Sequence, residues 1–229
     1  MADGPDAVVL DLDGVLVDSE ERWDGARRAL VADRGGEWKD GATEAMLGMS
    51  APEWSAYVRD ELAVDLPAEE IDADVVRRLL EGYRDELPLL PGAVDAVRRL
   101  AERWRLGLAS SSNAPVIATV LERAGLDDAI EAWVSSEEVT GGKPAPDVYL
   151  EAARRLRVDP ARAVAVEDSS NGLRSAAAAG MAVVAVPMRA FPPAPDALAL
   201  ADVTVDGIAN VTPEVVEEAF ARHQASAAR

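Results

Sequence analysis

The sequence predicts an α/β fold in which a doubly wound, mainly parallel sheet carries a helical insertion. Two observations predict it. From residue 92 onward, short apolar runs alternate with segments of helical spacing, and residues 20–88 show helical spacing alone. Strands that alternate with helices form right-handed βαβ units, so we expect a parallel sheet with helices on both faces.

The first predicted strand, residues 7–10, is a continuous apolar run, as in a strand that is buried on both faces. Asp11 and Asp13 follow it directly. By itself, the Asp-Gly pair at this point would also fit the turn of a surface hairpin. A helix capped by Asp18 or Ser19 is then expected to continue until a pair of glycines ends it.

Residues 20–88 are expected to form an all-helical domain, inserted into an α/β core of residues 1–19 and 89–229. Apolar side chains recur at helical spacing in residues 54–62 and again in residues 71–83. Such stripes are more typical of a packed core than of a ligand site.

After the insertion, strands and helices alternate to the end of the chain. A glycine at residue 125 and a proline at residue 146 fit the end of one helix and the first turn of another. The last helix is expected from residue 213. The remaining predicted strands are 106–109, 130–135, 163–166, 182–186 and 203–205.

Composition limits the possible functions. The chain has 229 residues, 49% of them hydrophobic, so it can bury a sizeable core. Its net charge of −19 argues against nucleic acid or an anionic membrane as partner. No run approaches the roughly 20 apolar residues of a membrane span, and no signal-peptide pattern begins the chain. We therefore expect a cytoplasmic protein, and a monomer, although the sequence leaves the oligomeric state open.

Three residue types are absent or scarce. There is no cysteine, which excludes thiolate catalysis and disulfides, and the only histidine is His223, near the end of the chain. A Ser-His-Asp or histidine–metal site is therefore not expected. Among 23 basic residues only Lys39 and Lys143 are lysines. A compact ammonium group suits a close phosphate or carboxylate contact, so Lys143, in a Gly- and Pro-rich loop, is a candidate binding residue.

Polar side chains follow three of the predicted strands. Asp11 and Asp13 end the first, Ser110 ends the second, and Glu167 with Asp168 ends the fourth. Ligands of parallel sheets bind beyond the carboxyl ends of the strands, so these side chains are expected to share one cleft. Carboxylates there suit Mg²⁺, which prefers oxygen ligands.

The same edge could bind an anion. Ser110, the backbone amides at the following helix start, and Lys143 would contact a phosphate. The nucleophile would then be a carboxylate, a hydroxyl or metal-bound water. Taken singly, Ser110 and Asp168 could be helix caps and Lys143 an ordinary loop residue. Those alternatives do not explain why all of them fall at one edge of one sheet.

Four segments resemble the motifs of the haloacid dehalogenase superfamily, phosphatase branch, with a helical cap inserted after the first strand. They occur in the family's order and are DLDGVLVDS (11–19), LASSSN (108–113), GKPAPD (142–147) and VEDSSNG (166–172). The resemblance implies a Rossmann-like core, with residues 20–88 as the cap.

The resemblance also implies roles. Asp11 would be the nucleophile and a Mg²⁺ ligand, and Asp13 the acid and base, with its carbonyl on the metal. Ser110 and Lys143 would bind the phosphoryl oxygens. Asp168 would bind the metal, and Glu167 would bind it directly or through water. Residues expected to contact the substrate are Ser111, Asn113 and, in the cap, Trp23.

Within this branch the sequence is similar to β-phosphoglucomutases and sugar-phosphate phosphatases. Trp23 stands where these mutases carry a histidine, and Ala51 where they carry an arginine. We therefore predict a Mg²⁺-dependent phosphatase that hydrolyses a small phosphorylated metabolite through an aspartyl-phosphate. A mutase is the alternative enzyme. A phospho-accepting signalling module is the alternative from another class, but it gives no reason for the inserted helices.

Overall fold

The computed structural model describes residues 4–46 and 49–227. The chain forms two compact units, one of residues 19–88 and one of the remaining residues. The first unit is wholly helical, and the second holds the sheet. That the helical unit serves as a cap stays a prediction.

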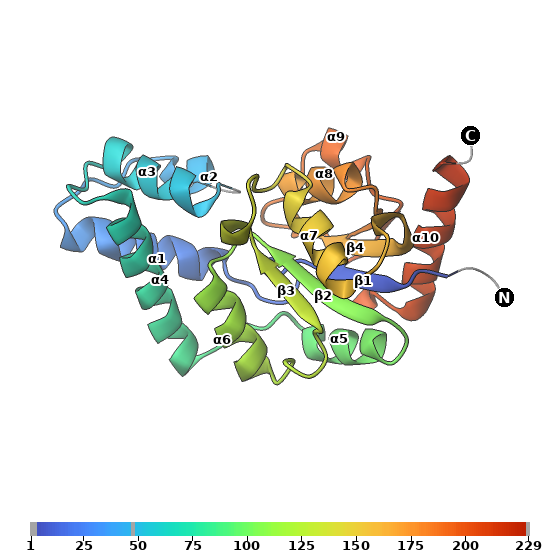
Figure 1. Ribbon diagram of the computed structural model, residues 1–229. Coiled ribbons are helices and arrows are strands. Elements are labelled where there is room, and N and C mark those ends of the chain that lie inside the picture. The colour runs from blue at the N-terminus through green and yellow to red at the C-terminus, as the bar shows by residue number, and fades with distance from the viewer. Residues whose placement is uncertain (1–3, 47–48, 228–229) are drawn as a thin grey trace. The chain divides into compact units, whose positions relative to one another are not determined.

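A six-stranded, wholly parallel sheet in the order β3-β2-β1-β4-β5-β6 forms the centre of the larger unit (Figure 1). This confirms the predicted fold class and excludes a surface hairpin at Asp13, because β1 lies in the middle of the sheet. The strands are β1 (Ala7–Leu10), β2 (Arg105–Ser110), β3 (Ala132–Ser135), β4 (Ala163–Glu167), β5 (Ala182–Ala185) and β6 (Val203–Thr204).

Helices cover both faces of this sheet. Figure 1 shows α7 and α8 on one side and α5 and α6 on the other, while α10 packs against β4 and β5. The chain moves outward from β1 to β3 and then returns to β4, so β1 and β4 flank the point where the strand order reverses. The helices are α5 (Ala93–Ala101), α6 (Ala114–Ala124), α7 (Asp147–Leu156), α8 (Ser170–Ala178), α9 (Pro195–Leu198) and α10 (Pro213–Ala227).

The sheet register aligns the ends of the three central strands. Leu10 pairs with Leu108 on β2 and with Val166 on β4. The Asp11 N–H then donates to the Val166 carbonyl at 3.0 Å. The residues that follow each strand therefore lie at one edge of the sheet, beside the reversal point where parallel sheets bind ligands.

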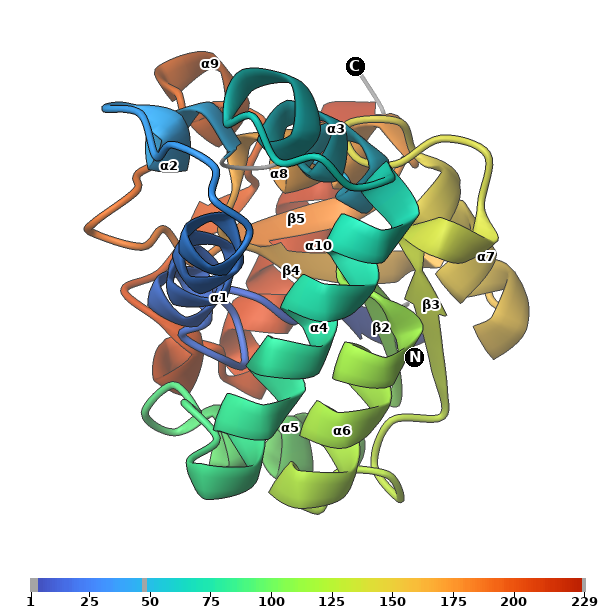
Figure 2. The same cartoon turned by 90° about the vertical axis from the view of Figure 1, so that its left-hand side faces the viewer.

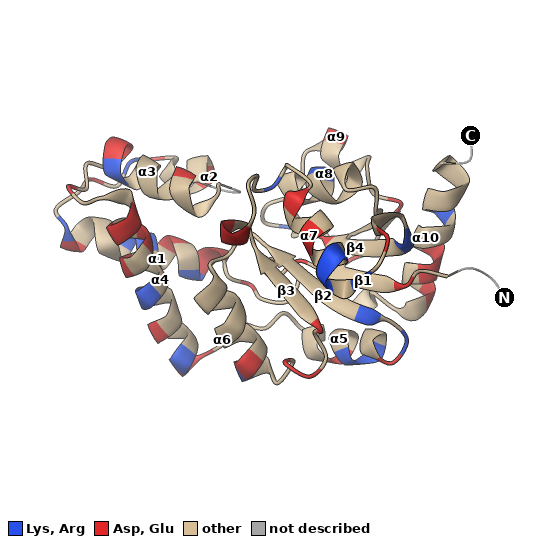
Figure 3. Cartoon of the chain, in the orientation of Figure 1, with Lys and Arg blue, Asp and Glu red and all other residues tan. Residues whose placement is uncertain are grey.

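The core explains why these strands form. Every residue of β1 is fully buried, and so are Ala109, Ala165 and Tyr149 in the cluster that joins the sheet to α7 and α8. Each fully buried large apolar side chain contributes about 1.5–3 kcal/mol. Charged residues lie mainly on the helices and at the strand ends, as Figure 3 shows.

The helical unit consists of α1 (Glu20–Asp33), α2 (Ala42–Met46), α3 (Ala51–Glu61) and α4 (Ala68–Asp85). Helix α4 packs against both α1 and α3 (Figure 2). Its buried face includes Ile71, Val75 and Leu79, which belong to the predicted stripe. Among the described residues, no helix is both long and apolar enough to cross a membrane.

An ion-pair network also links helices of this unit. Asp74 on α4 pairs with Arg77, with Arg78 and with Arg34, which follows α1. Burial alone would raise the pKa of Asp74, but the hydrogen bonds from these arginines lower it to about 2. The carboxylate is therefore stabilised as the charged form.

Element boundaries differ slightly from the prediction. Strand β3 begins at residue 132 rather than 130, because the Ile130 N–H donates to the Leu126 carbonyl in a turn. A short helix, α9, lies in the Pro-rich segment that was expected to be a loop. Neither difference moves a strand end of the candidate site.

Candidate active site

The turn after β1 brings two carboxylates to the edge of the sheet. Asp11 is 6% exposed, and Asp13 is half-buried. Gly14 adopts a φ of +73°, and its N–H donates to the Val17 carbonyl at 2.8 Å. A Cβ on Gly14 would lie 2.0 Å from Asp168 Oδ2, so only glycine allows Asp168 to approach this turn.

Three acids come together at this point. Oxygens of Asp11, Glu167 and Asp168 lie within 4.8 Å of one another. Asp11 lies more than 150 positions before the other two acids in the chain, and the pairing of β1 with β4 brings them together. The sequence prediction placed these residues together, and the structure does so.

Lys143 is the basic residue among them. Its side chain is only 4% exposed, and its ammonium lies 3.0 Å from Asp11 Oδ1 and 2.5 Å from Glu167 Oε1. It belongs to the loop of residues 139–146, between β3 and α7, and the peptide bond to Pro144 is cis. The loop thus places one ammonium group between two carboxylates.

The Glu167 carboxylate is fully buried and accepts several hydrogen bonds. Oε1 accepts from Lys143 Nζ and from the Tyr149 hydroxyl at 2.9 Å. Oε2 accepts from the Asp168 N–H at 3.0 Å and from the N–H and hydroxyl of Ser169, both at 3.2 Å. Gly172 makes room for this group, because a Cβ there would lie 1.9 Å from the carboxyl carbon.

Two serines at the end of β2 are bonded to each other, and one of them is bonded to Asp13. The Ser112 hydroxyl donates to Asp13 Oδ2 at 2.6 Å, and the Ser112 N–H donates to Ser110 Oγ at 2.9 Å. Ser110 is fully buried and Ser112 is 4% exposed. Ser110 Oγ accepts one bond here, and its hydroxyl hydrogen can be donated elsewhere.

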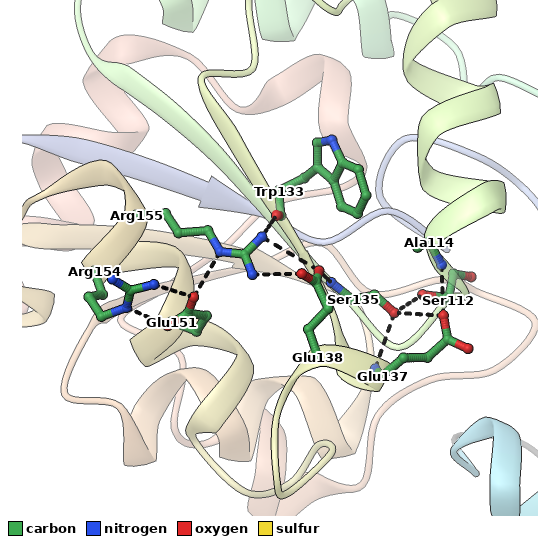
Figure 4. Close-up of polar contacts among 9 residues, drawn as sticks. All are labelled: Ser112, Ala114, Trp133, Ser135, Glu137, Glu138, Glu151, Arg154 and Arg155. Carbon is green, nitrogen blue, oxygen red and sulfur yellow. Dashed lines mark hydrogen bonds and ion pairs between the residues drawn. The ribbon is translucent and has the colours of Figure 1, made fainter.

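Asn113 and the start of α6 bind an internal carboxylate. Asn113 Nδ2 and the Ala114 N–H each donate to Glu137 at 2.9 Å, while the Ser135 hydroxyl donates to the Ser112 carbonyl at 2.8 Å. Figure 4 shows Glu137 beside Ala114 and Ser135. The helix start that was expected to bind a substrate anion thus has one of its amides bonded to Glu137. Ser111 is half-buried, and its carbonyl accepts from Ser136.

Burial and neighbouring like charges disfavour the ionised forms of Asp11 and Asp168. Burial raises the pKa of Asp11, Glu167 raises it further, and Lys143 opposes them. The pKa of Asp168 is raised by desolvation and by the neighbouring charges of Glu167 and Asp11. Burial would lower the pKa of Lys143, but Asp11 and Glu167 together raise it. The Lys143 ammonium therefore stays charged. It does not by itself offset the negative charges of Asp11, Glu167 and Asp168.

The donor set fits a magnesium ion. Asp11 Oδ1 is buried and lies 3.0 Å from the Lys143 ammonium, so this carboxylate can also offer an oxygen to a cation. Asp168 offers a second carboxylate at the same point. Hard cations prefer such oxygens, and Mg²⁺ commonly takes one or two protein carboxylates.

Comparison with known proteins identifies the family. A family model described as haloacid dehalogenase-like hydrolase matches residues 5–180. The chain belongs to the haloacid dehalogenase-like hydrolases. This confirms the predicted family and the predicted enzyme class. The matched residues of this hydrolase include all four motif segments.

Several relatives align over almost the whole hydrolase. Hexitol phosphatase B of Escherichia coli K12 is 33% identical over 222 residues, which are 90% of this chain and 94% of the relative. CbbY of Rhodobacter sphaeroides, solved in complex with phosphate, has a TM-score of 0.80 at 29% identity, covering 90% of this chain and 96% of its own. A β-phosphoglucomutase of Clostridium difficile has a TM-score of 0.81 at 21% identity, covering 98% and 100%, and shares the fold.

Trp23, the predicted substrate contact in the insertion, lies in α1 and is 7% exposed. Its ring centroid is 6.2 Å from that of Trp54 on α3, and the Arg27 guanidinium lies 5.4 Å from the Trp23 ring. Trp23 is thus part of the packing within the helical unit of the hydrolase.

Sequence reasoning missed three residues of the site: Ser112, Tyr149 and Gly172. Ser112 and Gly172 lie inside the second and fourth motifs, so their position was the available clue. Tyr149 lies on the buried face of α7, where the apolar pattern indicates only a core residue.

Proposed function

We propose that this hydrolase is a Mg²⁺-dependent phosphatase of a small phosphorylated sugar or sugar alcohol, working through an aspartyl-phosphate on Asp11. The observation that carries the proposal is the convergence of Asp11, Lys143 and Asp168 at the ends of β1 and β4. The relatives support the substrate class: one is named a hexitol phosphatase, and CbbY of R. sphaeroides was solved with xylulose 1,5-bisphosphate.

In the first step, an Asp11 oxygen would attack phosphorus and form an acyl-phosphate, while the bond to the leaving alkoxide breaks. Asp13, held by Ser112 at 2.6 Å, would give its proton to that alkoxide. Ser110 and Lys143 would donate to the phosphoryl oxygens, where charge develops. In the second step, Asp13 would take a proton from water as the water oxygen attacks phosphorus, which releases phosphate and restores Asp11.

Asp11, Asp168 and the Asp13 carbonyl would hold the metal. Bound Mg²⁺ would supply positive charge that keeps Asp11 ionised and stabilises the phosphoryl oxygens. The raised pKa values of Asp11 and Asp168 in the protein alone fit this role, because both carboxyls need a cation beside them to remain charged.

We further propose that the helical unit is the cap, which excludes water and selects the substrate. Both chain connections to it start from one place, since Val17 pairs with Leu89 in an antiparallel bridge. Trp23 packs against Trp54 and Arg27, and Ala51 offers no charge for a second phosphate. These features favour hydrolysis over the mutase reaction.

The test is phosphate release from p-nitrophenyl phosphate and from a panel of hexitol, hexose and pentose phosphates. We expect activity that a chelator abolishes and Mg²⁺ restores, and that Asp11→Asn reduces by at least about a thousandfold. Asp128→Asn, which changes an aspartate that is 72% exposed, is the matched control and should leave activity unchanged. Full activity in Asp11→Asn would refute the proposal. Conversion of glucose 1-phosphate to the 6-phosphate would favour the mutase.

A further inference from the structure

We propose that Tyr149 is a positioning residue for phosphoryl transfer: its hydroxyl fixes the buried Glu167 carboxylate, which in turn holds the Lys143 ammonium against Asp11. The inference rests on the proposed function and adds to it a residue outside the acid cluster. It also gives Glu167 a role beside Lys143.

Tyr149 lies in the first turn of α7 and is fully buried. Its hydroxyl donates to Glu167 Oε1 at 2.9 Å, the same oxygen that accepts from Lys143 Nζ at 2.5 Å. The Lys143 ammonium also lies 5.2 Å from the centre of the Tyr149 ring, within the range of a cation–π contact. One side chain thus touches both members of the buried ion pair.

The loop that carries Lys143 needs such support. Residues 139–146 form no helix or strand. The Ser175 hydroxyl of α8 fixes one point of the loop by donating to the Ala145 carbonyl at 2.6 Å. The end of the Lys143 side chain is positioned by its ion pairs with Asp11 and Glu167 and by the ring of Tyr149. Because lysine has four rotatable side-chain bonds, its ammonium stays in one place only if its partners do.

Glu167 is built to stay in place. Its two oxygens accept bonds from two side-chain donors on one side and from the Asp168 and Ser169 donors on the other. A carboxylate has about four lone-pair positions, so these donors occupy them. These bonds fix the orientation of the carboxylate, and its contact with Lys143 is the one through which it acts here.

A core role alone does not account for the tyrosine. The ring packs with the apolar residues of α7 and the sheet, and phenylalanine would fill that space equally well. The hydroxyl adds a bond to a charged, fully buried carboxylate, and such a bond is strong and directional. Lys143 must lie where negative charge develops on the phosphoryl group, so its placement affects the transition state more than substrate binding.

The test is Tyr149→Phe, which keeps the ring and its contact with the ammonium and removes only the hydroxyl. With the best substrate of the panel, we expect kcat to fall about three- to tenfold while KM stays within about twofold. Vanadate, which resembles the transition state, should bind more weakly by the same factor. Mg²⁺ binding to the metal-free protein, measured by titration calorimetry, should keep its stoichiometry and its affinity.

Tyr83→Phe is the matched control, because Tyr83 is the other fully buried tyrosine and lies in the helical unit. It should leave kcat, vanadate binding and Mg²⁺ binding unchanged. An unchanged kcat in Tyr149→Phe would overturn the inference. So would a loss of Mg²⁺ affinity that accompanies the loss of kcat, because Glu167 would then serve the metal. An inactive wild-type protein would instead refute the proposed function, and this inference with it.

Discussion

Replacing Glu167 by glutamine changes the candidate site without changing its shape. The buried carboxylate accepts bonds on both oxygens, two on Oε1 and three on Oε2. A glutamine amide has one accepting oxygen and one donating NH₂ group. If the NH₂ replaces Oε1, it faces the donors of Lys143 and Tyr149; if it replaces Oε2, it faces those of Asp168 and Ser169. The Tyr149 and Ser169 hydroxyls can turn to accept from the NH₂ group. The Lys143 ammonium in the first case, or the Asp168 and Ser169 N–H groups in the second, cannot, and they lose their acceptor.

Each buried donor without a partner costs about 1–3 kcal/mol, and Lys143 also loses half of its countercharge. We therefore expect Glu167→Gln to lower the free energy of unfolding by about 3–5 kcal/mol, the usual effect of breaking a buried ion pair. Urea unfolding followed by circular dichroism measures this difference.

Glu131→Gln is the control for removing one glutamate charge. Its side chain is 44% exposed and pairs with a half-exposed arginine, so the expected loss is below about 1 kcal/mol. If Glu167→Gln destabilised the protein no more than this control, the Glu167 carboxylate would not be the centre of the buried network, and the reasoning above would be wrong.

Three further predictions concern other residues of the chain. Gly172→Ala should lower both stability and activity, because the new Cβ would lie 1.9 Å from the carboxyl carbon of Glu167. Gly25→Ala in α1 is its control: a Cβ there meets nothing within 4 Å, so this variant should raise stability by about 0.5–1 kcal/mol. Thermal unfolding of the two glycine variants measures the contrast. Ser112→Ala removes the donor to Asp13 and should slow hydrolysis of an alkyl phosphate more than that of p-nitrophenyl phosphate, whose leaving group needs little acid catalysis. Equal slowing of both substrates would argue against a role for Ser112 in proton transfer. Asp74→Asn should lower stability by about 1 kcal/mol at pH 7, because hydrogen bonds from Arg78, Arg77 and Arg34 lower the pKa of Asp74 to about 2. Solvent reduces the effect, since Arg77 and Arg34 are half-exposed. A carboxylate with a lowered pKa stabilises the fold at pH values above its pKa in the unfolded chain, about 3.9. The difference in free energy of unfolding between wild type and Asp74→Asn should therefore shrink as the pH falls from 4 toward 2. If urea unfolding showed a constant difference over that range, the role given to Asp74 would be wrong.

The sheet and its ligand-binding edge could be predicted because they depend on local patterns. Apolar runs mark the strands, and the alternation with helices makes the sheet parallel. Once the sheet is parallel, Asp11 and Asp168 must follow β1 and β4 at the same edge. No detail of side-chain packing enters that argument.

The roles of Glu167 and Tyr149 could not be predicted in the same way. An acid after a strand can face a metal, a lysine or a helix start, and the choice depends on its rotamer. Here a glycine five residues later in the chain makes room for the Glu167 carboxyl under α8. The apolar pattern places Tyr149 in the core but does not show which group its hydroxyl meets.

The start of α6 shows a similar limit. The sequence indicates a free helix N-terminus beside Ser110, which would favour an anion. The partner of Asn113 and Ala114 is Glu137, which follows β3 and is distant in sequence. Only the pairing of β2 with β3 brings it there.

Phosphoryl transfer through Asp11 can be observed by finding the residue that carries the phosphoryl group during turnover. The enzyme is mixed with substrate and Mg²⁺, quenched in acid within milliseconds, digested, and mapped by mass spectrometry. We expect one acyl-phosphate on Asp11, present in wild type and absent from Asp11→Asn. A phosphoryl group on another residue, or steady turnover with no phosphorylated enzyme, would contradict this role of Asp11.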